Sequence, residues 1–391
     1  MQKTKFDLCL YLRAMGGMFF AKFIRLNRER KTMHFFIYYF FPFVVVLGIL
    51  IFFHELGHFL VAKYFNVKVV RFSLGFGFKL IGKKIGETEY VISTVPLGGY
   101  VKMLGENDDE AEEMSPEEAE RAFNNQGVLT RIAIVAAGPI FNMMLALCLF
   151  IGLYLVAGNY VLTPEIGQVR VDSPAHKAGL EKGDVILSVQ GYPTDSWSKI
   201  KKRVQDQAGM PLTITVQRGH QVLSMTVIPE AAIEKNIFGE DTKSALIGIV
   251  SSGKYQRLEL GPWQAVEEGL RKSWEVIRLT CLTVVKLFQR VIPIKTIGGP
   301  ILIGQMTGQL AQESFTYLIP FMAVISINLG ILNLLPIPIL DGGVIIFLLF
   351  ELIFRKPLSL KKREWAQKVG LFLLVFLMVV VFYNDISRLF E

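Results

Sequence analysis

Long apolar segments without charged side chains recur four times along the 391-residue chain. Asp, Glu, Lys and Arg are all absent from residues 35–53, 132–159, 314–340 and 369–384. A helix needs about 20 apolar residues to cross a bilayer core about 30 Å thick. The first three segments have that length, and the fourth reaches it if the span starts near Trp365 with Lys368 extending to the interface. The pattern predicts four transmembrane helices rather than four buried core helices.

The polar segments between these spans predict three further structures. Residues 65–130 begin with apolar–polar alternation and glycines, which predicts strands and hairpins, and then become acidic, with a helix start at Ser115. Residues 160–232 contain short alternating segments and capped turns typical of a compact α+β domain. Residues 233–313 include an amphipathic helix from 262 to 292, whose basic residues argue against a fifth span.

The distribution of basic residues predicts the orientation of the chain in the membrane. Short loops rich in Lys and Arg face the cytoplasm. Residues 355–368 contain six basic side chains, and the segment 65–130 is basic at both ends, so both are expected to be cytoplasmic. The soluble domain and both termini are then extracytoplasmic. The four spans fall within residues 33–64, 131–159, 314–354 and 365–386.

Composition agrees with a membrane protein and changes one expectation. The chain is 52% hydrophobic and 19% charged, below the quarter or so of ordinary soluble domains. Three cysteines exclude a disulfide-framed scaffold. Eight basic and two acidic residues precede Met33, so most of the net charge of +8 lies there, and the remaining cations flank spans rather than forming a nucleic-acid surface. Residues 1–32 conflict with the predicted orientation, which suggests a basic extension with Met33 as the true start.

Two histidines with metal-ligand spacing end the first apolar segment, in the sequence His54-Glu55-Leu56-Gly57-His58. Histidines four residues apart share one helix face and can bind one Zn²⁺, while the intervening carboxylate can take a proton from water at the metal. Ionisable groups at membrane depth are costly and usually functional. We therefore predict His54 and His58 as ligands and Glu55 as general base; the alternative is a polar helix end with neutral histidines.

A third protein ligand is needed to leave one position open for water. Asp341 is the candidate, because it lies at the end of the third apolar segment, where two prolines and two glycines interrupt the helical pattern. Broken helices at membrane depth occur where they face protein or a watery cavity. The alternative role for Asp341 is the N-cap of a helix over residues 344–354.

At these residues the chain resembles the site-2 protease family of intramembrane zinc metalloproteases, of the bacterial regulator-of-sigma-E type. The resemblance covers almost the whole chain after Met33. Its stretches, in family order, are HELGH with residues 71–77, then 89–90 and 96–103, 137–142, 298–301, 326–330 and 333–341. Residues 173–186 further resemble a single bacterial PDZ domain, where some relatives carry two.

The resemblance implies a function and roles for individual residues. His54, His58 and Asp341 would bind zinc, Glu55 would be the general base, and Asn328 and Asn333 would hold the substrate backbone. Residues 67–103 would form a membrane-associated β-loop that pairs with an unwound substrate strand. The expected activity is proteolysis of single-span membrane proteins in the bacterial inner membrane, such as anti-sigma factors after a first cut, and also remnant signal peptides.

Other functions remain open from the sequence alone. A different membrane zinc enzyme would use a downstream glutamate in place of Asp341. A membrane PDZ scaffold or a transporter with a structural metal site would have no use for Glu55. Asn328 and Asn333 could equally form hydrogen bonds between helices. The sequence leaves the substrate and the oligomeric state undetermined.

Overall fold

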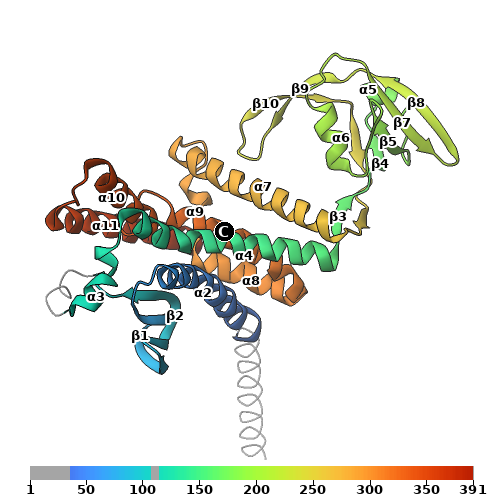
Figure 1. Cartoon of the computed structure of the whole chain (residues 1–391). Coiled ribbons are helices and arrows are strands. Elements are labelled where there is room, and N and C mark those ends of the chain that lie inside the picture. Colours follow the sequence, from blue (N-terminus) through green and yellow to red (C-terminus); the bar gives the residue numbers. More distant parts are fainter. Residues whose placement is uncertain (1–35, 107–113, 391) are drawn as a thin grey trace, which may run out of the picture. The chain divides into compact units, whose positions relative to one another are not determined.

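The computed structural model describes residues 36–106 and 114–390, which fall into two compact units. The first unit contains the chain up to Phe150 together with Glu275–Thr280 and Lys295–Glu391; the second contains Ile151–Trp274 and Cys281–Ile294. The expectations for residues 1–32, including a start at Met33, lie outside the described residues. Figure 1 shows the helices and strands of both units.

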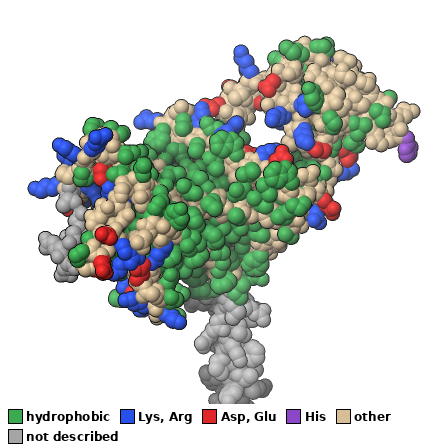
Figure 2. All heavy atoms as spheres, viewed as in Figure 1, with side chains coloured by type: hydrophobic (Ala, Val, Ile, Leu, Met, Phe, Trp, Pro, Cys, Tyr) green, Lys and Arg blue, Asp and Glu red, His purple; other side chains and the backbone are tan. Residues whose placement is uncertain are grey.

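Four helices of the described chain are long and apolar enough to span a membrane, as predicted. They cover Phe36–Tyr64, Val128–Ala157, Phe315–Asn333 and Lys361–Arg388. The corresponding elements are η1 (Phe36–Phe40) with α2 (Phe41–Tyr64), α4 (Val128–Ala157), η5 (Phe315–Tyr317) with α9 (Leu318–Asn333), and α11 (Leu360–Arg388). Figure 2 shows hydrophobic side chains over the surface of these helices, which is expected for a face in contact with lipid.

The third apolar segment contains a break between two helices. Helix α9 ends at Asn333, and α10 (Asp341–Phe354) begins only after Pro336 and Pro338, which cannot supply the backbone N–H groups of a continuing helix. Glycines allow α10 to fold back closely, since a Cβ on Gly343 would lie 2.5 Å from Cα of Pro338. The single span expected over 314–340 therefore ends early, and the break places Asp341 at the first turn of α10.

The predicted hairpin region is one curled antiparallel ribbon, β1 (Val69–Ile85) and β2 (Thr88–Met103). Both strands bend, so the first half of β1 is paired on both edges: Leu74 lies opposite Gly99 on one side and Ile92 on the other. Gly75 and Gly77 have φ angles of +91° and +90° at the bend, a conformation that favours glycine. The base of the ribbon packs with α2 and α4 in one apolar cluster.

Shorter elements complete the first unit. The predicted helix start at Ser115 is a capping box, in which Ser115 and Glu118 bond each other's backbone amides. The remaining elements are α3 (Pro116–Glu120), η3 (Phe123–Asn125), η4 (Ile294–Thr296), which straddles the unit boundary, and α8 (Pro300–Glu313). Helix α8 packs against the start of the first span, where Gly308 leaves room for the ring of Tyr39.

The second unit contains the predicted compact α+β domain. Its main sheet has the order β6-β5-β7-β8, and the alternating apolar side chains of these strands form a core with helices α5 and α6. The strands are β3 (Asn159–Leu162), β4 (Ile166–Val169), β5 (Val185–Val189), β6 (Tyr192–Pro193), β7 (Leu212–Arg218), β8 (Gln221–Val227), β9 (Glu230–Lys235), β10 (Asp241–Leu246), β11 (Ile249–Ser251) and β12 (Tyr255–Leu258). The helices are α5 (Pro174–Lys177), α6 (Trp197–Val204) and α7 (Pro262–Phe288), the last of which is the amphipathic helix and belongs partly to each unit.

The sheet domain continues beyond residue 232, the predicted boundary. Strand β11 pairs with β4, and β12 pairs with β3. Segments that precede the main sheet in the sequence therefore pair with segments that follow it. Ile247 is buried in the same core as Ile166. The boundary was placed too early because these pairings join segments about 80 to 100 residues apart, which local patterns do not reveal.

Candidate metal centre

Helix α2 presents the two histidines of the HELGH sequence toward helix α4. His54 and His58 lie one helical turn apart, as predicted, with ring centroids 4.8 Å apart. The helices approach closely at Gly57, where a Cβ would stand 2.8 Å from the carbonyl carbon of Ala137. The glycine of HELGH therefore lets the histidine-bearing face lie directly on the backbone of α4.

Asp341 joins the two histidines from the first turn of α10. Its Oδ2 lies 3.2 Å from Nε2 of His54 and 3.7 Å from Nε2 of His58, and the two Nε2 atoms are 3.3 Å apart. The alternative role as an N-cap is not what the structure has, because Leu340 is the N-cap residue. Two helices separated by nearly 300 residues thus bring three ligand-type atoms to one point.

This triangle of atoms has the dimensions of a tetrahedral metal site. Ligand atoms about 2.0–2.2 Å from one zinc ion are about 3.3–3.6 Å from each other in a tetrahedron. The three observed separations agree with that range to within about 0.1 Å. In addition, Asp341 Oδ2 is buried without a hydrogen-bond partner, a costly arrangement that a cation would satisfy. The residues present fit a divalent metal.

The opposite ring nitrogens of both histidines are engaged by α4, which leaves Nε2 for the metal. Nδ1 of His58 donates to the carbonyl of Ile134 at 2.9 Å. Nδ1 of His54 lies 3.3 Å from the amide of Asn142, whose Oδ1 is buried and otherwise lacks a partner. When the side-chain amide of Asn142 is turned so that Oδ1 and Nδ2 exchange places, Oδ1 accepts a hydrogen bond from Nδ1–H of His54 and gains a partner. Such partners fix the tautomer and orientation of metal-binding histidines.

Gly138 of α4 provides the space that the imidazoles occupy. A Cβ at this position would stand 2.6 Å from Cε1 of His58 and 2.8 Å from Cε1 of His54. Sequence reasoning gave Gly138 and Asn142 no role of their own. The sequence does mark them as unusual, because a glycine and an asparagine lie four residues apart in an apolar helix. Each of these residue types destabilises such a helix unless it makes a specific contact.

Glu55 lies beside the metal-ligand triangle and next to strand β2. A Cβ at Gly99 would stand 3.0 Å from Cγ of Glu55, so this strand passes the glutamate at van der Waals distance. Glu55 is not part of the three-residue group that could hold a metal. Its carboxylate therefore remains available for another role at the same place.

The two predicted substrate-binding asparagines differ in position. Asn333, the last residue of α9, has its Nδ2 3.3 Å from Nε2 of His54. Asn328 accepts a hydrogen bond of 2.6 Å from the hydroxyl of Thr280, which is a bond between helices. Asn333 thus lies at the ligand triangle, whereas no contact of Asn328 with the triangle occurs among the described residues.

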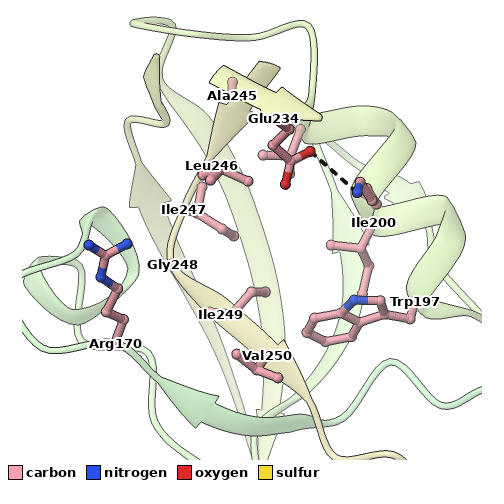
Figure 3. A pocket seen from close by; sticks show the side chains of 12 residues that line it. Arg170, Trp197, Ile200, Glu234, Ala245, Leu246, Ile247, Gly248, Ile249 and Val250 are labelled. Carbon is pink, nitrogen blue, oxygen red and sulfur yellow. Dashed lines mark ion pairs between the residues drawn. The ribbon is translucent and has the colours of Figure 1, made fainter. Parts of the chain in front are cut away.

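A second cavity, of about 320 Å³, lies within the sheet domain between α6 and the segment Ala245–Val250. Figure 3 shows Trp197 and Ile200 of α6 facing Ile247 and Ile249 across an apolar cleft. Glu234 pairs with Lys201 at 3.3 Å on one side. Among the described strands, β11 is paired only with β4, so its other edge is open to this cleft.

A candidate membrane-spanning helix with an HExxH pair, joined by a carboxylate from the helix after the break, defines a protein of the zinc metalloprotease class. The chain belongs to peptidase family M50, whose sequence profile matches residues 42–377. The match includes the two histidines, the glutamate and the aspartate described above.

Curated relatives share most of their length with this chain. A protein of Campylobacter jejuni, named as an inferred zinc metalloprotease, is 39% identical over 88% of this chain and 92% of its own length. A protein of Agrobacterium fabrum with the same type of name is 35% identical over 90% and 96%. Protease RseP of Yersinia pestis is 32% identical over 89% of this chain and 98% of that protein.

A solved structure resembles a part of this chain. The PDZ domain of the SdrC-like protein from Listeria monocytogenes is 20% identical, and the match covers 22% of this chain and 84% of that one, with a TM-score of 0.19. The α+β fold of the sheet domain is defined by its own strand order and core.

Proposed function

We propose that the chain is an intramembrane zinc endopeptidase that cleaves single-span membrane proteins in the bacterial inner membrane. The observation that carries the proposal is the triangle formed by Nε2 of His54, Nε2 of His58 and Oδ2 of Asp341 on helices of the membrane-spanning unit. The names of the relatives support zinc as the metal. Anti-sigma factors that have already been cut once, and remnant signal peptides, are the substrate classes we propose.

In the proposed mechanism, His54, His58 and Asp341 hold the metal and Glu55 moves the proton. Zinc, when bound there, would polarise the scissile carbonyl and make water more acidic. The Glu55 carboxylate would accept a proton from the attacking water and deliver it to the leaving amide nitrogen. Asn142 and the Ile134 carbonyl keep both imidazoles in the orientation that the site needs. Asn333 would hold a substrate carbonyl beside His54.

Strand β2 is well placed to present the substrate to Glu55. A transmembrane helix has all its peptide bonds hydrogen-bonded internally, so a segment must unwind before it can be attacked. The stretch of β2 around Gly99 runs past Glu55, and an unwound segment could pair with it as an added strand. The far half of β1 exposes Phe78, Leu80 and Ile81, which suits a ribbon that enters the lipid interface.

The sheet domain is proposed to be an extracytoplasmic PDZ domain that binds substrate C-termini. Its cleft combines the open edge of β11 with an apolar wall from α6, the arrangement that β-strand addition requires. Gly248, with φ +79°, forms the bend beside the cleft where backbone amides can meet a carboxylate. A first cut outside the membrane would create the new C-terminus that this domain recognises.

The proposal is tested by co-expressing the protein with tagged single-span proteins whose extracytoplasmic parts have been trimmed. Wild type is expected to shorten a reporter at a bond within its membrane segment, as mapped by mass spectrometry. Glu55→Gln removes the proposed base while conserving size, and it should leave the reporter intact. Continued cleavage at the same bond with Glu55→Gln, at equal expression and in a host that lacks its own site-2 protease, would refute the assignment.

A further inference from the structure

A cavity of about 440 Å³ lies in the first unit, away from the ligand triangle, where α4 begins and α10 ends. Its apolar wall comes from Val344, Phe347 and Leu348 of α10 and from Leu358 in the loop that leads to α11. Its polar lining includes Arg131, Glu351, Ser359 and Arg363. Volumes of this size hold small organic molecules in other proteins.

One of the two arginines that line this cavity, Arg131, already has partners within the protein. Arg131 is buried, its Nη2 donates to Glu351 at 2.5 Å, and its Nε donates to the carbonyl of Gln126 at 3.1 Å. The ion pair joins α4 to α10, and its charges cancel. Glu351 therefore does not offset a further positive charge in the cavity.

The second arginine that lines this cavity is Arg363. The half-buried guanidinium of Arg363 forms no hydrogen bond or ion pair in the described part of the chain. The hydroxyl of Ser359 caps no backbone amide of α11, although Ser359 occupies the N-cap position. A lone guanidinium and a hydroxyl thus face a cavity whose other wall is apolar. Such a site suits a ligand that is anionic at one end and apolar at the other.

The surroundings favour a lipid over a soluble anion. Arg355, Lys356, Lys361 and Lys362 lie next to Arg363 in the chain, and Figure 2 shows Lys and Arg side chains gathered at the α10 and α11 end of the molecule in this view. The helices that meet here are two candidate spans and the second half of the broken helix. Basic pockets between such helix ends bind anionic lipid head groups.

We infer that this cavity is a binding site for one anionic phospholipid, whose phosphate contacts Arg363 and Ser359 and whose glycerol and acyl region lies against Phe347 and Leu358. The site is separate from the proposed peptidase centre. It is joined to that centre through α10, which begins at Asp341, and through α4, which carries Asn142. A bound lipid would therefore brace the two helices that position the histidines and the aspartate.

The test uses the full-length protein in detergent with phosphatidylglycerol or phosphatidylcholine of identical acyl chains. Native mass spectrometry is expected to show one retained phosphatidylglycerol per wild-type chain, and the same lipid should raise the unfolding temperature more than phosphatidylcholine does. Arg363→Gln should lower the affinity by about tenfold or more, since a direct hydrogen bond to a charged group contributes about 1.5 kcal/mol or more. Ser359→Ala should give a smaller loss in the same direction.

Lys361→Gln is the matched control, because it removes the same charge from an exposed position outside the cavity. It should lower the affinity by less than about twofold through weaker screened attraction. An equal loss in Lys361→Gln and Arg363→Gln would show diffuse surface attraction and overturn the proposal. So would unchanged lipid retention in Arg363→Gln, or equal stabilisation of wild type by inorganic phosphate at the same concentration.

Discussion

Gly138 of α4 lies directly beneath the imidazole of His58, so close that a Cβ on it would stand 2.6 Å from Cε1. Separations below 3 Å do not occur between real Cβ atoms and their neighbours, so Gly138→Ala must displace His58 or open the contact between α2 and α4. We expect the zinc affinity to fall by at least tenfold, as measured by competition with a chromogenic chelator, and the peptidase activity to fall with it.

Gly152→Ala is the control for this substitution. Gly152 lies in the same helix, and a Cβ there would meet nothing within 4 Å. Alanine is favoured over glycine in a helix by about 1 kcal/mol, so this variant should bind zinc normally and be slightly more stable. If both variants bind zinc like the wild type, the close packing of Gly138 on the histidines has no bearing on the site.

Asp341 and Glu55 should separate metal binding from proton transfer. Asp341→Asn replaces an anionic ligand by a neutral amide, so we expect purified protein to lose nearly all of its bound zinc by elemental analysis. Glu55→Gln leaves the ligand triangle unchanged and should retain zinc while activity falls by about 10² to 10⁴-fold. Loss of zinc in Glu55→Gln would instead make Glu55 a ligand.

Asn142 should act through His54 rather than on the substrate. Removing the partner of a metal-binding histidine usually costs about 10- to 100-fold in metal affinity or activity, and we expect this of Asn142→Leu. Asn142→Asp keeps an oxygen that can accept the Nδ1 proton of His54, so it should retain most of the affinity. A similar loss in both variants would point to packing in α4 as the cause.

The four candidate spans and the proposed ligands of the centre could be named from the sequence because each rests on a local pattern. The length of an apolar segment identifies a span, and helix geometry alone places His54 and His58, four residues apart, on one face. Asp341 required one more step, its place where prolines and glycines interrupt the third apolar segment. The structure added that these side chains meet at one point, with separations that suit a single ion.

Features that depend on contacts between distant segments could not be predicted. The sequence marks Gly138 and Asn142 as unusual in an apolar helix, but their roles follow only from where α2 lies on α4. Likewise, the pairing of β11 with β4 that extends the sheet domain past residue 232 is a long-range register. For Asn328, the sequence left open a hydrogen bond between helices, and the structure has such a bond with Thr280.

Glu87, at the turn of the ribbon, should make the ribbon's attachment depend on pH. Arg121 donates two hydrogen bonds to its carboxylate, at 2.7 and 2.8 Å, and Lys63 pairs with it as well, which lowers the pKa of Glu87 from 4.5 to about 2. A lowered folded-state pKa contributes stability above pH 4.5 that disappears as the pH falls toward 2. The protection of the ribbon amides, measured as the hydrogen-exchange rate relative to the intrinsic rate at each pH, should fall in that window.

Glu87→Gln provides the control for this pH effect. Glutamine cannot ionise, so the ribbon amides of the variant should already be less protected from exchange at pH 6. Their protection should also change less with pH below 4.5. The effect should be modest, because the side chain is 29% exposed and surrounded by solvent-accessible partners. An identical pH profile in wild type and Glu87→Gln would assign the acid sensitivity to other carboxylates.

Asp385, near the end of α11, should fix the start of α8. Its Oδ1 accepts the amide of Gly299 at 2.9 Å, and its Oδ2 accepts those of Ile301 and Leu302 at 3.0 and 3.1 Å, so a buried carboxylate caps a helix 84 residues away. Asp385→Ala leaves these donors unpartnered at a cost of about 1–3 kcal/mol, so their hydrogen exchange should accelerate by roughly 5- to 150-fold. Asp385→Asn keeps one acceptor and should lie between, and Ser387→Ala should change nothing. Unchanged exchange at residues 299–302 in Asp385→Ala would show that α8 holds its start without this cap.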